Sequence, residues 1–183
     1  MAVTPTVEEK IVLGSGKLYV MEFTTTIPTD LLLEVDANKL GDVQGGAVLT
    51  YKPKFYTAKS DDGAVAKTII TEEEATLKSG VMTWCGATLK KLAATARVTE
   101  AEGKRTVKIG GIANQDGKKY AIRFLHDDPV NGTIRITVVG NNQAGFALAF
   151  TKDKETVVDA EFTALPHDSE GTLILYEEQI PTV

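Results

Sequence analysis

The chain has 183 residues, of which 43% are hydrophobic and 25% charged, which suffices for one folded domain and argues against disorder. Its formal net charge of −5 argues against tight nucleic-acid binding, because that affinity comes mostly from cationic contacts with phosphates. The single cysteine excludes an intrachain disulfide and fits synthesis in a reducing cytoplasm, and we expect neither a signal peptide nor a membrane-spanning segment.

The first fifty residues are predicted to contain two strand regions. Residues 1–10 read as a loose polar arm, and residues 11–23 follow as a strand or strand pair broken at the glycines of residues 14–16. Both faces of the second half of this region are apolar, so we expect it to be covered on both sides. Residues 24–40 are interpreted as a connector, and residues 41–51 as a strand entered through glycines.

Residues 52–63 are predicted to form a long hairpin arm or loop that projects from the body. A proline that cannot donate to a strand ladder and a closing Asp-Gly turn signal favour this interpretation. Lysines flank two adjacent aromatic residues within it, and residues 64–70 then lead into one long strand. The candidate residues of this arm are Lys52, Pro53, Lys54, Phe55, Tyr56, Lys59, Asp61 and Asp62.

A helix of about twelve residues is predicted at residues 87–98. Leu89, Leu92, Ala93 and Ala96 recur at helical spacing on one apolar face, and Arg97 is expected in the last turn. Such a short helix must dock on other elements to be stable. The tryptophan and cysteine just before it, residues 84 and 85, are expected to be a core anchor and a small buried apolar residue.

The second half of the chain alternates between apolar and polar residues with a period of two. The alternation is clear at residues 119–124, 133–138, 146–151 and 158–163, and a last strand is expected at residues 172–177. Short strands with one polar face are typical of antiparallel sheets that pack a core. We therefore predict a mainly β protein, an antiparallel β-sandwich or half-barrel with one flanking α-helix, in a single domain.

No arrangement of residues predicts catalysis. The Gly-Ser-Gly at residues 14–16 lacks the further glycines of a nucleotide loop, and the two histidines, His126 and His167, lie far apart, each beside an aspartate. His126 is better explained by a solvated turn than by a metal site. The glutamates of residues 72–74 are better explained as a solvated acidic edge than as paired catalytic acids. We expect no enzyme activity, cofactor or metal.

Several segments, in this order and spacing, resemble one protein family. They are residues 12–20, the glycine-led strand at 45–51, residues 74–84 before the helix, the glycine pair at 110–111, residues 146–162 and the closing strand from residue 171. Together the chain resembles the major tail tube protein of long, non-contractile bacteriophage tails. The resemblance implies a β-sandwich flanked by one helix, and we expect these 183 residues to hold no C-terminal immunoglobulin-like domain of the kind that some family members append.

The resemblance also implies a function. Members of this family assemble as hexameric rings that stack into the tail tube of the virion, through which DNA is ejected. By position, residues 52–63 correspond to the loop that orders when rings stack, and the terminal arms make further contacts. The implied partners are other copies of the chain and tape measure, tail terminator and tail tip proteins, with DNA passing without tight binding and no membrane involved.

The net negative charge of the chain suggests which surface would line such a tube, because DNA can slide along a neutral or acidic wall. We hypothesise that the polar face bearing Asp159, Glu161 and Thr163 lines the lumen. Arg123 and Arg135 complicate this hypothesis, because some acids must pair with them if they share that face. Two alternatives remain: the inner tube of a contractile tail or secretion system, and a β-sandwich binding module that recognises carbohydrate or protein.

Overall fold

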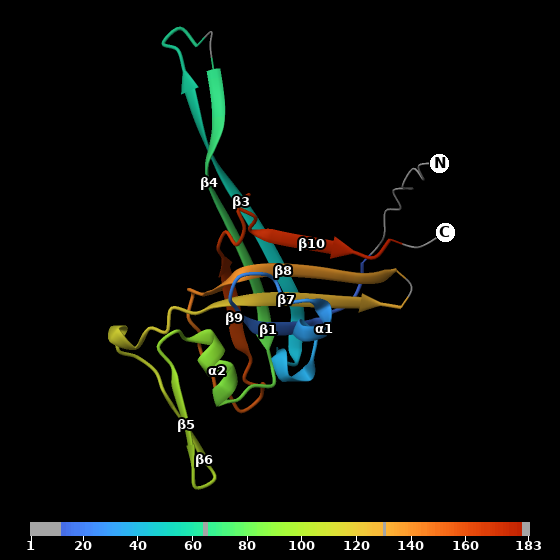
Figure 1. The fold of residues 1–183 in the computed structure, drawn as a ribbon, viewed down its shortest axis with the longest axis vertical. Helices are drawn as coiled ribbons and strands as arrows, with labels where there is room; N and C mark the ends of the chain where they lie inside the picture. The colour runs from blue at the N-terminus through green and yellow to red at the C-terminus, as the bar shows by residue number, and fades with distance from the viewer. Residues whose placement is uncertain (1–11, 64–65, 130, 181–183) are drawn as a thin grey trace.

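The fold is built on one antiparallel sheet of eight strands (Figure 1). The computed structural model describes residues 12–63, 66–129 and 131–180. It is 52% strand and 10% helix, so the prediction of a mainly β, antiparallel protein is confirmed. The sheet has the order β2–β1–β7–β8–β9–β4–β3, with β10 also paired to β8, and a separate two-stranded sheet is formed by β5 and β6.

The strands of the large sheet are much more unequal in length than the sequence pattern predicts. The longest pair, at one edge, runs for 17 and 16 residues, whereas the strand at the other edge has only three. The bounds are β1 (Lys17–Phe23), β2 (Lys39–Gly41), β3 (Val43–Lys59), β4 (Ala66–Val81), β7 (Lys119–Asp128), β8 (Gly132–Asn142), β9 (Val158–Ala164) and β10 (Ile174–Glu178). The predicted arm at residues 1–10 lies outside the described residues.

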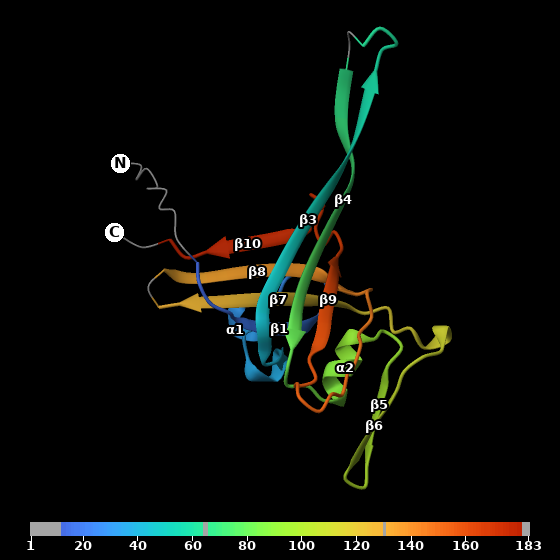
Figure 2. The same cartoon turned by 180° about the vertical axis from the view of Figure 1, so that it is seen from behind.

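The sheet bends so that its two parts face each other across the core. In both Figures 1 and 2, β1, β7, β8 and β10 run across the direction of β3, β4 and β9. Ile122 and Val138 from the first part pack in one cluster with Leu77 and Phe162 from the second, and all four are buried. The two layers expected of a sandwich are therefore two parts of one continuous sheet.

A glycine permits the close approach where the two parts of the sheet meet. Gly140 of β8 pairs with Ala164 of β9, and a Cβ atom on Gly140 would lie 1.9 Å from the carbonyl oxygen of Thr163. No side chain fits at such a distance. The glycine is required by the tight contact between strands rather than by a turn.

The segment between β1 and β3, interpreted from the sequence as a connector, contains regular structure. It holds the short helix α1 (Asp30–Leu33), the 3₁₀ turn η1 (Asp36–Asn38) and β2. Leu33 is buried, and Leu18, Tyr19 and Val20 of β1 are all buried. Strand β1 is therefore covered on both faces, as predicted, and α1 contacts it.

The predicted helix is shorter than its apolar pattern indicates. Helix α2 (Gly86–Leu92) ends before Ala93, which has an extended backbone, and Arg97 begins strand β5 (Arg97–Ala101) instead of closing a helix. The carbonyl oxygens of Ala93 and Ala94 accept hydrogen bonds from Ala96 and Asp116, so a turn replaces the second half of the helix. Pairing of β5 with β6 (Lys104–Lys108) outweighs the helix propensity of this alanine-rich segment, because tertiary contacts routinely override propensity.

The strand predicted at residues 146–151 is also absent. Asn142 closes a turn by donating from Nδ2 to the carbonyl oxygen of Gly145 (2.9 Å) and accepting from its N–H at Oδ1 (2.9 Å). Phe146 then packs on the core from an irregular segment, whereas Phe150 is exposed and lies beside Trp84 with ring centroids 6.2 Å apart. Trp84 packs against the core and donates its indole N–H to the carbonyl oxygen of Thr156, which supports its predicted anchoring role.

Candidate assembly surfaces

The most prominent surface is the distal half of the β3–β4 hairpin, which projects from the body of the molecule (Figures 1 and 2). Strand β4 pairs with β9 only over residues 76–81, so in the described residues the part of the hairpin beyond them is a two-stranded ribbon. A two-stranded ribbon is marginally stable in water unless something packs against it. This projection is therefore expected to be stabilised by a partner.

Apolar side chains lie on both faces of this ribbon. Phe55 pairs with Ile70 on one face and Tyr56 with Ile69 on the other, and the two aromatic residues are 58% and 60% exposed. We name these four residues the hairpin patch. Both isoleucines are also exposed. Each face of the ribbon thus exposes one aromatic residue beside one isoleucine, which makes both faces candidate interaction surfaces.

The residues predicted for a projecting loop lie mostly in strand. Lys52, Pro53, Lys54, Phe55, Tyr56 and Lys59 belong to β3, and only Asp61 and Asp62 lie in the turn. Of the two forms predicted for this segment, a hairpin arm or a loop, the structure has the hairpin arm, which is an ordered two-stranded ribbon.

Charges of both signs meet at the base of the ribbon, where three glutamates of β4 lie opposite two lysines of β3. Lys54 forms an ion pair with Glu72 across the strands (2.9 Å), and the Tyr51 hydroxyl donates to Glu73. That hydrogen bond to a carboxylate raises the pKa of Tyr51 above its ordinary value. Nearer the tip, Lys59 and Lys67 each lie opposite an alanine in the strand register. Two lysines therefore border the hairpin patch on its tip side, and Asp61 and Asp62 follow in the turn.

The predicted lumen-facing residues share one face of β9. Asp159, Glu161 and Thr163 alternate with the buried Val158, Ala160, Phe162 and Ala164. Lys78 of β4 lies between the two acids, 3.6 Å from Asp159 and 3.7 Å from Glu161. One lysine against two carboxylates leaves this face acidic, and such exposed pairs contribute little to stability.

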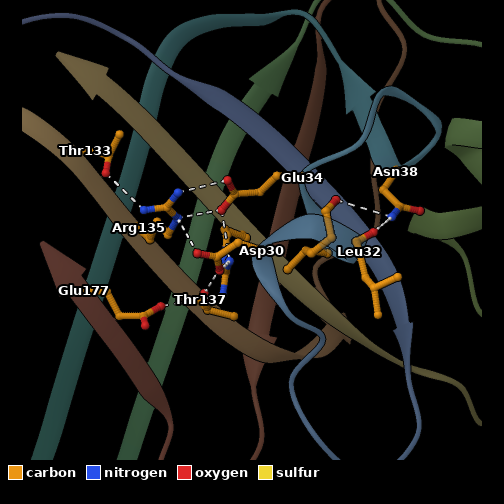
Figure 3. A network of polar contacts seen from close by, with 10 residues as sticks. Asp30, Leu32, Glu34, Asn38, Thr133, Arg135, Thr137 and Glu177 are labelled. Carbon is orange, nitrogen blue, oxygen red and sulfur yellow. Dashed lines mark hydrogen bonds and ion pairs between the residues drawn. The ribbon is translucent and has the colours of Figure 1, made fainter. Parts of the chain in front are cut away.

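The two arginines that complicated the lumen hypothesis have partners of their own. Alternation along β7 and β8 places Arg123 and Arg135 on the non-core face of the sheet, where both contact acids of the α1 segment. Figure 3 shows Arg135 beside Asp30 and Glu34. Arg123 is only 2% exposed. It donates to Asp30 and Glu34 of the α1 segment and to the Thr137 hydroxyl (2.8 Å), and Glu177 of β10 lies 3.6 Å away. The acids that pair with the arginines thus come from α1 and β10, and Asp159 and Glu161 are not used.

Glu34 is the centre of this network. Its carboxylate accepts hydrogen bonds from Arg135 Nε (2.7 Å), Arg135 Nη2 (3.1 Å) and Arg123 Nη1 (3.0 Å). Burial by itself raises the pKa of Glu34, but the hydrogen bonds from Arg135 and Arg123 outweigh it and hold the pKa below its ordinary value of 4.5. The Glu34 carboxylate is therefore ionised at neutral pH, and its hydrogen bonds to both arginines fasten the α1 segment to the sheet.

Sequence reasoning missed the role of α1. Its acids and the arginines are separated by 89 to 101 residues, and no local pattern joins them. The available signal was the spacing of Asp30 and Glu34, which puts two carboxylates on one side of a helical turn, together with two arginines on a polar sheet face.

Two other residues differ from their predicted environments. Cys85, expected to be buried, is exposed at the start of α2, where a hydrogen bond from the Thr88 backbone lowers the pKa of its thiol. His126, expected in a solvated turn, lies buried in β7 with Nδ1 2.7 Å from the carbonyl oxygen of Ser15. Strand β7 continues through Asp128 and carries the histidine into the interior. Glu72, Glu73 and Glu74 are exposed, as predicted.

In the ranges that the structure describes, no group of three or more His, Cys, Asp or Glu side chains is placed to hold a metal ion. No helix among the described residues is long and apolar enough to span a membrane. No protein-family model matches the sequence, and no curated protein matches it significantly.

Proposed function

We propose that this chain is a structural virion protein, a tail tube subunit whose copies form hexameric rings that stack into the conduit for DNA ejection from a phage. The observation that carries the proposal is the β3–β4 ribbon, which exposes Phe55 and Tyr56 on opposite faces, and no other described residue of the chain covers them. A ribbon of this kind gains stability only when it packs against another molecule.

The open edges of the sheet support the same proposal. Strand β3 lies at the end of the sheet and pairs only with β4, so a long row of its backbone donors and acceptors is unpaired within the described chain. Long exposed edges invite pairing with further strands unless they are managed. Closure of identical sheets into a ring removes such edges, and stacking of rings through different surfaces continues as a tube.

The acidic face of β9 is the surface we assign to the lumen. Asp159 and Glu161, only partly balanced by Lys78, would repel the DNA backbone over roughly 8 Å at physiological salt, which is enough to prevent tight binding along the wall. Tape measure, tail terminator and tail tip proteins are the further partners that the proposal implies.

Electron microscopy of the concentrated protein tests the proposal directly. Rings or tubes are the expected result, and a protein that stays monomeric at every concentration would refute it in favour of a binding module that uses Phe55 and Tyr56. The inner tube of a contractile tail would form rings as well. This alternative therefore predicts the same assembly of the chain and differs only in the sheath around the tube.

A variant with a truncated hairpin tests whether assembly requires the ribbon. Replacing residues 55–71 with Asn-Gly keeps the Lys54–Glu72 pair next to a two-residue turn of the type that hairpins prefer. We expect a folded monomer with the circular dichroism of a β protein and no tubes. Tubes formed by the truncated protein would show that the ribbon is not needed for assembly.

A further inference from the structure

The segment from α2 through β6 has a charge opposite to that of the rest of the chain. Residues 86–108 hold six lysines and arginines against two glutamates, a net charge of +4, although the whole chain has a net charge of −5. In both Figures 1 and 2, β5 and β6 extend from the body at the end opposite to the β3–β4 ribbon. Such a local concentration of positive charge on an acidic chain is typical of a surface that binds an anionic partner.

The two faces of the β5–β6 hairpin differ in composition. One face holds the cross-strand pairs Val98–Val107 and Glu100–Arg105. This face packs against α2, because a Cβ atom on Gly86 would lie 2.6 Å from a methyl group of Val107 and 2.8 Å from Cδ of Arg105. The opposite face of the hairpin is therefore turned away from α2.

The face turned away from α2 carries positive charges and hydroxyl groups. We name it the cationic face, and its residues are Arg97, Thr99, Ala101, Lys104, Thr106 and Lys108. All are exposed except Thr106, which is partly buried, and the three cations form no ion pair with any described residue. The two glutamates of the hairpin lie elsewhere, Glu100 paired with Arg105 on the α2 side (2.5 Å) and Glu102 in the turn. No carboxylate of the hairpin therefore balances the charge of the cationic face.

The arrangement of these cations weakens the hairpin by itself. Arg97 lies directly opposite Lys108, and like charges in that position destabilise a pair of strands. On the β3–β4 ribbon, in contrast, Lys54 has Glu72 across from it at 2.9 Å. A bound anion would relieve the repulsion between Arg97 and Lys108.

We propose that the cationic face binds the phosphate backbone of duplex DNA without reading its sequence, a property that does not depend on the proposed function. Arginine, lysine and threonine side chains are common donors to phosphate oxygens. Lys104 and Lys108 are four residues apart on one strand, or about 13 Å. Because a duplex carries one charge for about every 1.7 Å of its axis, the cations of this face can each contact a separate phosphate.

The composition of the cationic face disfavours other anionic partners. Protein interfaces bury aromatic and aliphatic anchors, and surfaces that bind membranes insert apolar side chains, whereas this face has only Ala101. Single strands are held by bases that stack on aromatic side chains, and β5 and β6 contain none. Charges and hydroxyl groups alone suit the backbone of a duplex.

The binding is expected to be weak at physiological salt, because only three cations contact phosphates. Each phosphate contact contributes about −0.9 to the slope of the logarithm of the binding constant against the logarithm of salt concentration. Three contacts give a slope of about −2.7, so the affinity falls about 80-fold between about 20 and about 100 mM salt. Weak binding of this kind is compatible with DNA that passes along a tube without being held.

Fluorescence anisotropy of a labelled DNA duplex, measured with the full chain over this range of salt, tests the proposal. The double variant Lys104→Gln, Lys108→Gln leaves one cation on the face, so we expect its slope to fall to about −0.9 and its affinity to change only about fourfold. Lys59→Gln is the matched control, because it removes an exposed lysine from a strand of the other hairpin. We expect the control to keep the slope of the unmodified chain.

Three results would overturn the proposal: no binding at low salt, an equal loss of slope in the control, or binding to phosphatidylserine vesicles without binding to the duplex. The substituted lysines are exposed, so the circular dichroism of each variant should match that of the unmodified chain. Tubes without DNA binding would remove this proposal and leave the proposed function standing. DNA binding by a protein that forms no tubes would do the reverse.

Discussion

Replacing Glu34 with alanine tests whether the arginine network fastens α1. The substitution removes three hydrogen bonds from two guanidinium groups and leaves Arg123 buried, with Thr137, the half-exposed Asp30 and the more distant Glu177 as its remaining partners. Breaking a buried ion pair from one side costs about 3–5 kcal/mol. Because Asp30 and Glu177 still balance part of the charge on Arg123, we expect a loss of about 3 kcal/mol, the lower end of that range.

Urea unfolding, followed by circular dichroism at a concentration where the protein is monomeric, measures this loss. With a slope of about 2 kcal/mol per molar urea, the midpoint falls by about 1.5 M. Asp36→Ala is the matched control, because it removes an equal charge two residues away from an exposed position. We expect that control to change stability by less than about 0.5 kcal/mol. Equal effects of the two substitutions would refute the assignment of Glu34 as the centre of the network.

The same network predicts a pH dependence. The pKa of Glu34 is lower in the folded protein than its ordinary value of 4.5, so the unfolded chain binds the proton more tightly. The stability that Glu34 contributes is therefore complete above pH 4.5 and is lost as the pH falls through the lower folded-state pKa. The difference in stability between the wild-type protein and Glu34→Ala should narrow below pH 4.5, and a constant difference would contradict this reasoning.

Three further substitutions test the core, the strand crossing and the small sheet. Phe162→Ala removes a fully buried ring and should lower the free energy of unfolding, measured in urea, by about 3–5 kcal/mol. Val48→Ala, at an exposed position of β3, should lower it by less than about 0.5 kcal/mol. Gly140→Ala should lower the thermal midpoint by an amount equivalent to about 1–3 kcal/mol, because its methyl group would collide with the carbonyl oxygen of Thr163, and an unchanged midpoint would contradict the close approach. Arg97→Glu should stabilise the protein by about 0.2–1 kcal/mol, because it replaces a like-charge pair with Lys108 across β5 and β6, and a loss of stability would show that Arg97 has another role.

The sequence allowed the faces of the central strands to be predicted because one periodic signal determines them. The alternation at residues 119–124, 133–138 and 158–163 identifies Ile122, Val138 and Phe162 as inward-facing, and all three are buried. The same rule failed at residues 146–151, where Phe146 reaches the core without pairing to any neighbouring strand. A period of two shows which side chains would lie on the same face of a strand. A strand also needs a neighbouring strand to pair with, and a single sequence does not reveal which strand edges are open to pairing.

Local patterns also could not predict the elements that depend on distant contacts. Helix α2 stops at Leu92 because the following residues bond to Asp116 and Gly110 from elsewhere in the chain. Helix α1 exists because arginines about ninety residues away hold its acids. The hairpin, in contrast, could be placed from sequence because its turn and the β-branched and aromatic residues on both strands lie within one short stretch.

The size of the hairpin patch sets how assembly depends on concentration. Its four apolar side chains are each about half covered in the monomer, so complete burial would contribute roughly 1 kcal/mol apiece, or about 4 kcal/mol per ribbon. That gain only matches the low end of the roughly 4–15 kcal/mol that joining two free molecules costs. A single ribbon would therefore not hold two copies together. A ring that presents several ribbons at once binds through all of them and loses little further translational and rotational entropy for each added ribbon. Assembly by this contact should begin only once rings exist, which makes the free chain stable as a monomer and growth of the tube steeply dependent on concentration.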